Sequence, residues 1–199
     1  MAGVTYSPQI YGMTCEEAVL EMALSHEGIS VSQEQVLSAE GVNTSVPGVG
    51  PAYTKADPMV NFVGPPNGGE AAGYEPGAFY GAIVDAADRL GGDVIAAGNN
   101  ISPAQVYNYV DQNHPVEVWV TFDFHVDYPT TWLTNGIDTW PWAGPDEHAV
   151  LIVGVDSNSV LIDNPWPAHS AYYGPDQWVP KSTFETVYGV YGDMAVVLR

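Results

Sequence analysis

The stretch Gln9-Ile10-Tyr11-Gly12-Met13-Thr14-Cys15-Glu16-Glu17-Ala18-Val19-Leu20-Glu21-Met22-Ala23-Leu24 holds the only cysteine of the chain, at the predicted start of a helix. Thr14 is a favourable N-cap, and Glu17 three positions later completes a predicted capping box, so Cys15 falls in the first turn. Free backbone N–H groups and the helix dipole there favour a thiolate. We therefore expect a nucleophilic cysteine, with a small buried hydrophobe as the alternative.

The two glutamates that follow the cysteine act against this expectation. Glu16 and Glu17 suit a helix start, but negative charges raise the pKa of a nearby thiol unless a cation lies opposite. A nucleophilic Cys15 therefore requires a histidine elsewhere in the sequence.

The composition of the chain limits the kinds of partner that the protein can have. The 199 residues suffice for one globular domain, with 46% apolar residues spread along the chain. There are 24 acidic and 4 basic residues, a formal net charge of −20. Nucleic acid and anionic membranes carry the same sign and are poor partners, whereas a cationic peptide or wall component suits this surface. No apolar stretch is long enough to span a membrane.

Further helices and strands follow from local patterns. Ser32 with Gln35 forms a second capping box, and helices are predicted over about 79–90 and from Ser102-Pro103 onward. Residues 116–122 alternate as a strand with one core face and one half-exposed face. The glycine- and proline-rich segment 42–77 is interpreted as a groove wall, with a plain surface loop as the alternative. The irregular segment 124–146 carries Trp132, Trp140 and Trp142, which suit either a peptide cleft or loop anchors.

A second informative stretch supplies the histidine. Residues 148–155 and 160–166 are two apolar runs joined by Asp156-Ser157-Asn158-Ser159, the pattern of a buried β-hairpin. His148 stands at the outer end of the first strand, and Asp163 and Asn164 at that of the second. An imidazole and a side chain that can orient it therefore reach one edge of the sheet.

The hairpin register decides which residue orients His148. If Val155 faces Val160 in a regular ladder, Asp163 shares the face of His148. A bulge reverses this assignment in favour of Asn164.

Together these motifs resemble the papain-like cysteine peptidase superfamily: Gln9 six positions before Cys15, a downstream His148, and Asn164-Pro165-Trp166 after the next strand. Among its members, the chain is similar to the bacterial bacteriocin-processing, double-glycine-leader peptidases and their stand-alone relatives. The resemblance implies an α+β fold forming a single domain over residues 1–199. A helical part, about 9–112 and headed by the cysteine helix, would pack on an antiparallel sheet, about 115–199.

The resemblance also implies a reaction. Cys15 would be the nucleophile, His148 its base, and Gln9 the oxyanion donor with the backbone N–H of Cys15. Asn164 would orient His148, with Asp163 as the alternative, and Trp166 would shield that hydrogen bond. The expected activity is hydrolysis of peptide bonds through a thioester, with no cofactor and no metal.

Two other functions remain compatible with the sequence: a related acyl transferase or deamidase, and a catalytically silent module that binds peptides. The expected partner is a peptide or protein substrate, with a cationic one favoured. The acidic, lysine-poor composition favours secretion or the cell envelope of a bacterium, with the signal peptide absent from this sequence; a cytoplasmic location is the alternative.

Overall fold

The computed structural model describes residues 1–44, 57–68, 77–125, 131–134, 139–142, 147–167 and 172–199. The side chains of 131–134 and 139–142 lie outside the description, so the interpretation of Trp132, Trp140 and Trp142 is not addressed. The helices are α1 (Cys15–His26), α2 (Gln33–Glu40), α3 (Tyr80–Leu90), α4 (Pro103–Asp111) and α5 (Lys181–Gly189). The strands are β1 (Val42–Asn43), β2 (Phe62–Val63), β3 (Val94–Gly98), β4 (Val116–Thr121), β5 (Thr131–Thr134), β6 (Thr139–Trp142), β7 (Glu147–Val155), β8 (Ser159–Asn164), β9 (Gly174–Pro180) and β10 (Ala195–Leu198).

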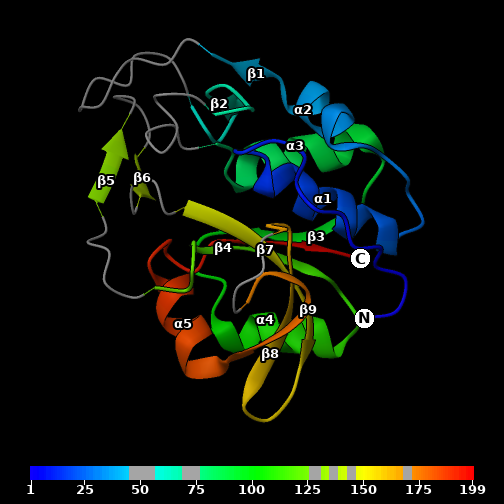
Figure 1. Ribbon diagram of the computed structural model, residues 1–199, viewed down its shortest axis with the longest axis vertical. Coiled ribbons are helices and arrows are strands. Elements are labelled where there is room, and N and C mark those ends of the chain that lie inside the picture. Colours follow the sequence, from blue (N-terminus) through cyan, green and yellow to red (C-terminus); the bar gives the residue numbers. More distant parts are fainter. Residues whose placement is uncertain (45–56, 69–76, 126–130, 135–138, 143–146, 168–171) are drawn as a thin grey trace.

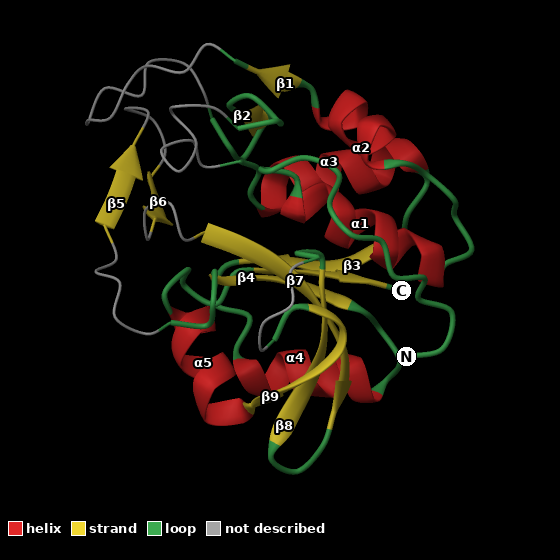
Figure 2. Ribbon diagram, viewed as in Figure 1, coloured by secondary structure: helices red, strands yellow, loops and turns green. Residues whose placement is uncertain are grey.

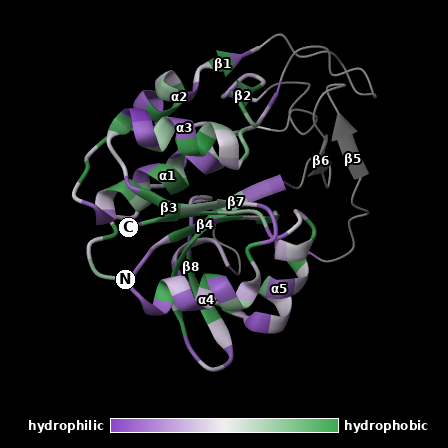
Figure 3. Cartoon of the chain, turned by 180° about the vertical axis from the view of Figure 1, so that it is seen from behind, coloured by the Kyte–Doolittle hydropathy of each residue, from purple (hydrophilic) through white to green (hydrophobic). Residues whose placement is uncertain are grey.

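A six-stranded antiparallel sheet lies between two helical layers. Its strand order is β3-β10-β4-β7-β8-β9. Helices α1, α2 and α3 cover one face, and α4 and α5 cover the other (Figures 1 and 2). Two apolar clusters fill the spaces on either side, and the central strands are correspondingly hydrophobic in Figure 3. The α+β class predicted from the sequence is confirmed.

One of the two predicted capping boxes is present and the other is not. Ser32 with Gln35 makes both bonds of the box. The predicted helix start at Ser102 also has a box, formed with Gln105. At α1, Thr14 makes no capping bond to the helix; its hydroxyl donates to the carbonyl of Tyr11 instead. Glu17 is fully buried, and its carboxyl group lies beside that of Glu40. The box at Cys15 was therefore a wrong prediction, because Glu17 faces the interior and not the helix start.

The sheet also differs from the sequence pattern. Every residue of β4 is buried, so its expected half-exposed face is wrong: Trp119 on that face lies in an apolar cluster with residues of α1 and α3. Strand β3 was not predicted, yet it pairs with β10 at one edge. Helix α4 packs on the face of the sheet opposite α1. Helix α5 and strand β10 follow the hairpin in the chain.

The register of β7 and β8 contains a bulge. Val155 faces Val160 as predicted, but the ladder shifts between Ile152 and Gly154, so that Leu151 faces Asp163. The bulge places one extra residue in β7. Beyond the bulge, the residues of β8 that share a face with His148 therefore shift by one position. Asn164, and not Asp163, therefore shares the face of His148.

The loop segments are described only in part. Within 42–77, residues 45–56 and 69–76 lie outside the described residues, and β1 and β2 form a short parallel pair. In the described parts of the chain, no helix has both the length and the apolar character needed to cross a membrane.

Candidate active site

Cys15 is the first residue of α1, and its side chain lies between the helix and β7. Its Sγ donates a hydrogen bond to Glu16 Oε2, 3.0 Å away. Burial, followed by the charges of Glu16 and Glu147, raises the pKa of the thiol well above its usual value, while the backbone N–H of Ala149 acts in the opposite direction. The expected low pKa is therefore not found: in this structure the stable form of Cys15 is the protonated thiol.

Glu16 is fixed on both sides. Its Oε1 accepts the backbone N–H of Ala78 at 2.9 Å, and Trp119 Nε1 donates to the carbonyl of Ala78 at 3.0 Å. Gly77 has φ +61°, and a Cβ there would lie under 3.0 Å from Glu16 Oε1. Burial raises the pKa of the Glu16 carboxyl to about 7. The carboxyl group is thus held in place next to the thiol.

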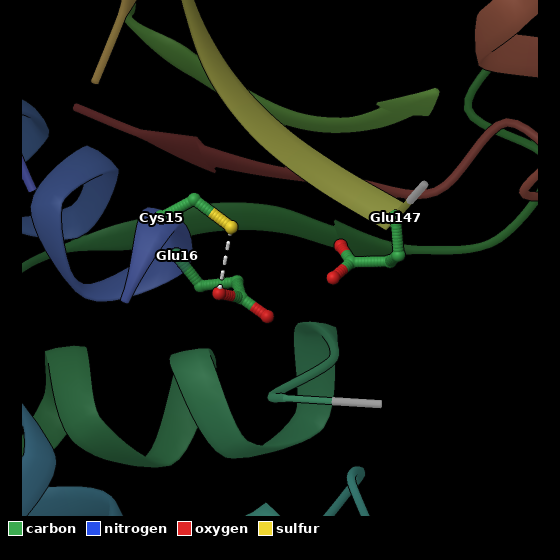
Figure 4. A group of neighbouring side chains, drawn as sticks. All are labelled: Cys15, Glu16 and Glu147. Atoms are coloured by element: carbon green, nitrogen blue, oxygen red, sulfur yellow. Dashed lines mark hydrogen bonds between the residues drawn. The ribbon is translucent and has the colours of Figure 1, made fainter. Parts of the chain in front are cut away.

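Glu147 approaches the same thiol from the start of β7. One ligand atom from each of Cys15, Glu16 and Glu147 lies within 4.8 Å of the others. Figure 4 shows both carboxylates directed toward the space between α1 and the end of β7. Burial, then the charges of Glu16 and Glu117, raise the pKa of Glu147 well above its ordinary value.

His148 forms a buried pair with Asn164. Its Nε2 lies 2.8 Å from Asn164 Oδ1, and the carbonyl character of that atom assigns the proton to Nε2. Asn164 is itself held, because its Nδ2 donates to the carbonyl of Tyr172 and its Oδ1 accepts the N–H of Trp166. Burial lowers the pKa of His148 to about 4, so the imidazole is neutral at pH 7.

An aromatic side chain covers this pair. The ring of Phe122 lies 5.1 Å from the imidazole of His148 and 5.1 Å from Trp166, edge-on to both. The resemblance implied that Trp166 shields this hydrogen bond. Phe122 is the ring that contacts both residues.

His148 and Cys15 are not hydrogen-bonded to one another; both are described residues, and each bonds elsewhere. Glu147 and Ala149, the neighbours of His148 on β7, are the residues that act on the thiol. The structure thus brings the two predicted catalytic groups to the same end of β7 without joining them.

Gln9 links the N-terminal segment to the His148–Asn164 pair. Its backbone N–H donates to the carbonyl of Pro165, next to Asn164, at 2.9 Å. Its side-chain Nε2 donates to the carbonyl of Tyr11, and its Oε1 is buried without a partner. The segment before Cys15 is therefore attached to the end of β8.

Gln33 holds this segment in place by hydrogen bonds. Its role was not predicted from the sequence. Its Oε1 accepts the N–H of Ile10, and its Nε2 donates to Pro8 and to Glu21. Nothing in the spacing of Gln33 distinguishes it from an ordinary surface residue of α2, since its role depends on how the N-terminal segment folds back. Phe122 and Glu147 were missed for the same reason: their function depends on tertiary contacts.

Comparisons with known proteins identify the family and the fold of the chain. The sequence is 29% identical over 195 residues to the uncharacterized protein YvpB of Bacillus subtilis (strain 168), covering 97% of this chain and 71% of that protein. The fold is similar to the crystal structure of a candidate C39-like peptidase from Bacillus anthracis, with a TM-score of 0.79 at 20% identity over 98% of this chain and 94% of the other.

A second solved structure shares the fold more distantly. It is the peptidase domain of Streptococcus ComA, a bifunctional ABC transporter involved in quorum sensing, with a TM-score of 0.54 at 17% identity over 97% of this chain and 96% of the other. The model of the Peptidase_C39 like family matches residues 1–196. The chain therefore belongs to the Peptidase_C39 like family and has the papain-like fold of C39-like peptidases.

Proposed function

We propose that this protein is a cysteine peptidase that hydrolyses peptide bonds through a thioester on Cys15. The observation that carries the proposal is the buried hydrogen bond between His148 and Asn164 at the end of β7 nearest the thiol. An imidazole held by an amide oxygen at Nε2 presents Nδ1 as its proton acceptor. Family membership adds support for this chemistry.

In the proposed reaction, His148 Nδ1 takes the proton of Cys15, and the thiolate attacks the carbonyl carbon of the substrate. The imidazolium then protonates the leaving amine as the C–N bond breaks, leaving an acyl group on sulfur. Water, deprotonated by His148, attacks the thioester and releases the acid and the thiol. Asn164 keeps the imidazole in the required tautomer through both steps.

Gln9 is assigned to the oxyanion. An amide nitrogen carries two N–H groups, and Gln9 Nε2 uses one of them for the carbonyl of Tyr11. The second is assigned to the substrate oxygen, together with the backbone N–H of Cys15.

The resting enzyme has to change its protonation state before attack. A thiol of raised pKa and an imidazole with a pKa of about 4 are both neutral at pH 7. We assign the change to substrate binding, which brings Cys15 from Glu16 to His148. The net charge of −20 favours peptides or proteins with cationic character as substrates, and it favours a secreted or envelope location.

The test is capture by a panel of peptidyl vinyl sulfones, read by intact mass. These electrophiles react with an aligned, activated thiolate. We expect one adduct on Cys15 in the native protein, none in Cys15→Ser, and labelling slowed by about 100-fold in His148→Ala. If iodoacetamide labels Cys15 but no vinyl sulfone does, the protein is a silent peptide-binding module and the proposal fails.

A further inference from the structure

We propose that Cys15, Glu16 and Glu147 form a zinc site, in which Zn²⁺ binds the thiolate and one oxygen of each carboxylate. Metal binding by these three residues does not depend on catalysis. The consequence of metal binding, reversible inhibition of Cys15 as a nucleophile, rests on the proposed peptidase function.

The three side chains have the spacing that a single ion requires. Their ligand atoms lie within 4.8 Å of one another, and Cys15 Sγ is 3.0 Å from Glu16 Oε2. Zinc bonds sulfur at about 2.3 Å and carboxylate oxygen at about 2.1 Å, which places tetrahedral ligands about 3.5 Å apart. Small side-chain rotations therefore suffice to close the three groups on one ion, with a fourth position left for water.

One carboxylate oxygen of this group has no partner. Glu147 Oε1 is closed off from solvent and makes no hydrogen bond to the described residues, although the residue as a whole keeps some exposure. In Figure 4 its carboxylate is directed toward the Cys15–Glu16 pair. A buried carboxylate oxygen without a donor is unfavourable, and a cation at this point supplies the missing partner.

None of the lysine and arginine side chains in the described part of the chain supplies a positive charge at this point. Arg89 and Arg199 pair at the surface with Asp85 and Asp93. Lys181 lies 4.4 Å over the ring of Tyr107. The fourth such residue, Lys55, lies outside the described residues. A cation from solution would compensate the charge of the two carboxylates.

The surroundings pre-organise the ligands and favour a positive charge. Glu16 is fixed by the N–H of Ala78, the kind of outer contact that orients a metal ligand. Glu117 is fully buried with neither oxygen paired, and its charge acts on Glu147. A thiolate among the ligands selects zinc over calcium or magnesium, which prefer oxygen alone.

Binding is an exchange of protons for metal without any redox step. The S–H bond of Cys15 is replaced by a sulfur–zinc bond, and the thiol proton is released to solvent together with any proton held by the two carboxyl groups. Donation of electron density to zinc lowers the nucleophilicity of the sulfur, and the ion occupies the space through which the thiolate would reach a carbonyl. Removal of the ion by a chelator restores the thiol.

Cobalt titration tests the site directly. Protein treated with EDTA and then dialysed is titrated with Co²⁺ at neutral pH, and the sulfur-to-cobalt charge-transfer absorption is followed. We expect a saturable band in the native protein, displacement of Co²⁺ by Zn²⁺, and no band in Cys15→Ser. In Glu147→Gln the affinity should fall by more than about tenfold, because a ligand is lost.

Glu40→Gln is the matched control. Glu40 is buried and its charge acts on Glu16, but it contributes no ligand, so affinity should change by less than about threefold. Absence of the band in the native protein overturns the zinc site, as does equal loss of affinity in Glu147→Gln and Glu40→Gln. Peptide capture is read separately: an active protein without the band refutes the metal site alone, and an inactive protein with the band refutes the peptidase alone.

Discussion

Gly77→Ala tests whether Glu16 is held as the structure shows. Gly77 has φ +61°, and an added Cβ would come under 3.0 Å from Glu16 Oε1, with the backbone around Ala78 leaving little room to shift. Two costs follow. A left-handed conformation costs a non-glycine residue about 1–2 kcal/mol, and displacing the carboxylate from the N–H of Ala78 loses a charge-assisted bond of about 1.5–3 kcal/mol.

Gly91→Ala separates these costs. Gly91 ends α3 with φ +90°, and an added Cβ there meets nothing within 4 Å. The substitution therefore carries only the conformational cost of about 1–2 kcal/mol, whereas Gly77→Ala should cost about 3–5 kcal/mol.

Thermal unfolding by calorimetry compares the two variants. At about 2–4 °C per kcal/mol for a domain of this size, we expect Tm to fall by about 2–8 °C in Gly91→Ala and about 6–20 °C in Gly77→Ala. Iodoacetamide labelling of Cys15 should also change in Gly77→Ala alone, because its hydrogen-bond acceptor moves. Equal destabilisation in both variants, with unchanged labelling, would show that Glu16 is not fixed between Ala78 and Cys15.

Three further predictions concern the rest of the site. Asn164→Ala should slow vinyl sulfone capture by about 100-fold, whereas Asp163→Asn, on the other face of β8, should leave it unchanged; equal effects would contradict the bulged register. Gln33→Leu removes the acceptor and donors that hold the N-terminal segment, so amide hydrogen exchange over 9–14 should accelerate, and unaltered protection there would refute the role of Gln33. Burial raises the pKa of Glu40 to about 8 from an ordinary 4.5, so its folded form binds the proton more tightly, and its contribution to the free energy of unfolding should fall as pH rises from about 4.5 to about 8. Glu40→Gln should flatten the measured slope over that range, and parallel native and variant curves would argue against the shift.

The fold was predictable where local chemistry decides it. The cysteine helix, the capping box at Ser32, the helix start at Ser102 and the hairpin after His148 each follow from a short sequence pattern. Strand β3 was not predictable in this way, since Val94–Gly98 is held as an edge strand by pairing with a segment almost 100 residues later.

The hairpin pattern predicted that His148 and an Asp or Asn side chain meet at one edge of the sheet, but it did not predict the electrostatic environment of Cys15. The choice between Asp163 and Asn164 depended on one bulge in β7, which the apolar run did not indicate. The predicted low pKa of the Cys15 thiol is wrong, because a position at a helix start does not offset burial. Desolvation of Cys15, with Glu16 and Glu147 beside it, outweighs the favourable end of the helix dipole.

Cleavage of a peptide library in water enriched in ¹⁸O tests the central claim most directly. The account predicts new peptide C-termini carrying ¹⁸O with the native protein, and none with Cys15→Ala or His148→Ala, because hydrolysis of a thioester places a water oxygen in the released acid. Products without ¹⁸O would indicate transfer to another acceptor. Cleavage that persists in Cys15→Ala, or no cleavage by the native protein, would contradict a peptidase whose nucleophile is Cys15.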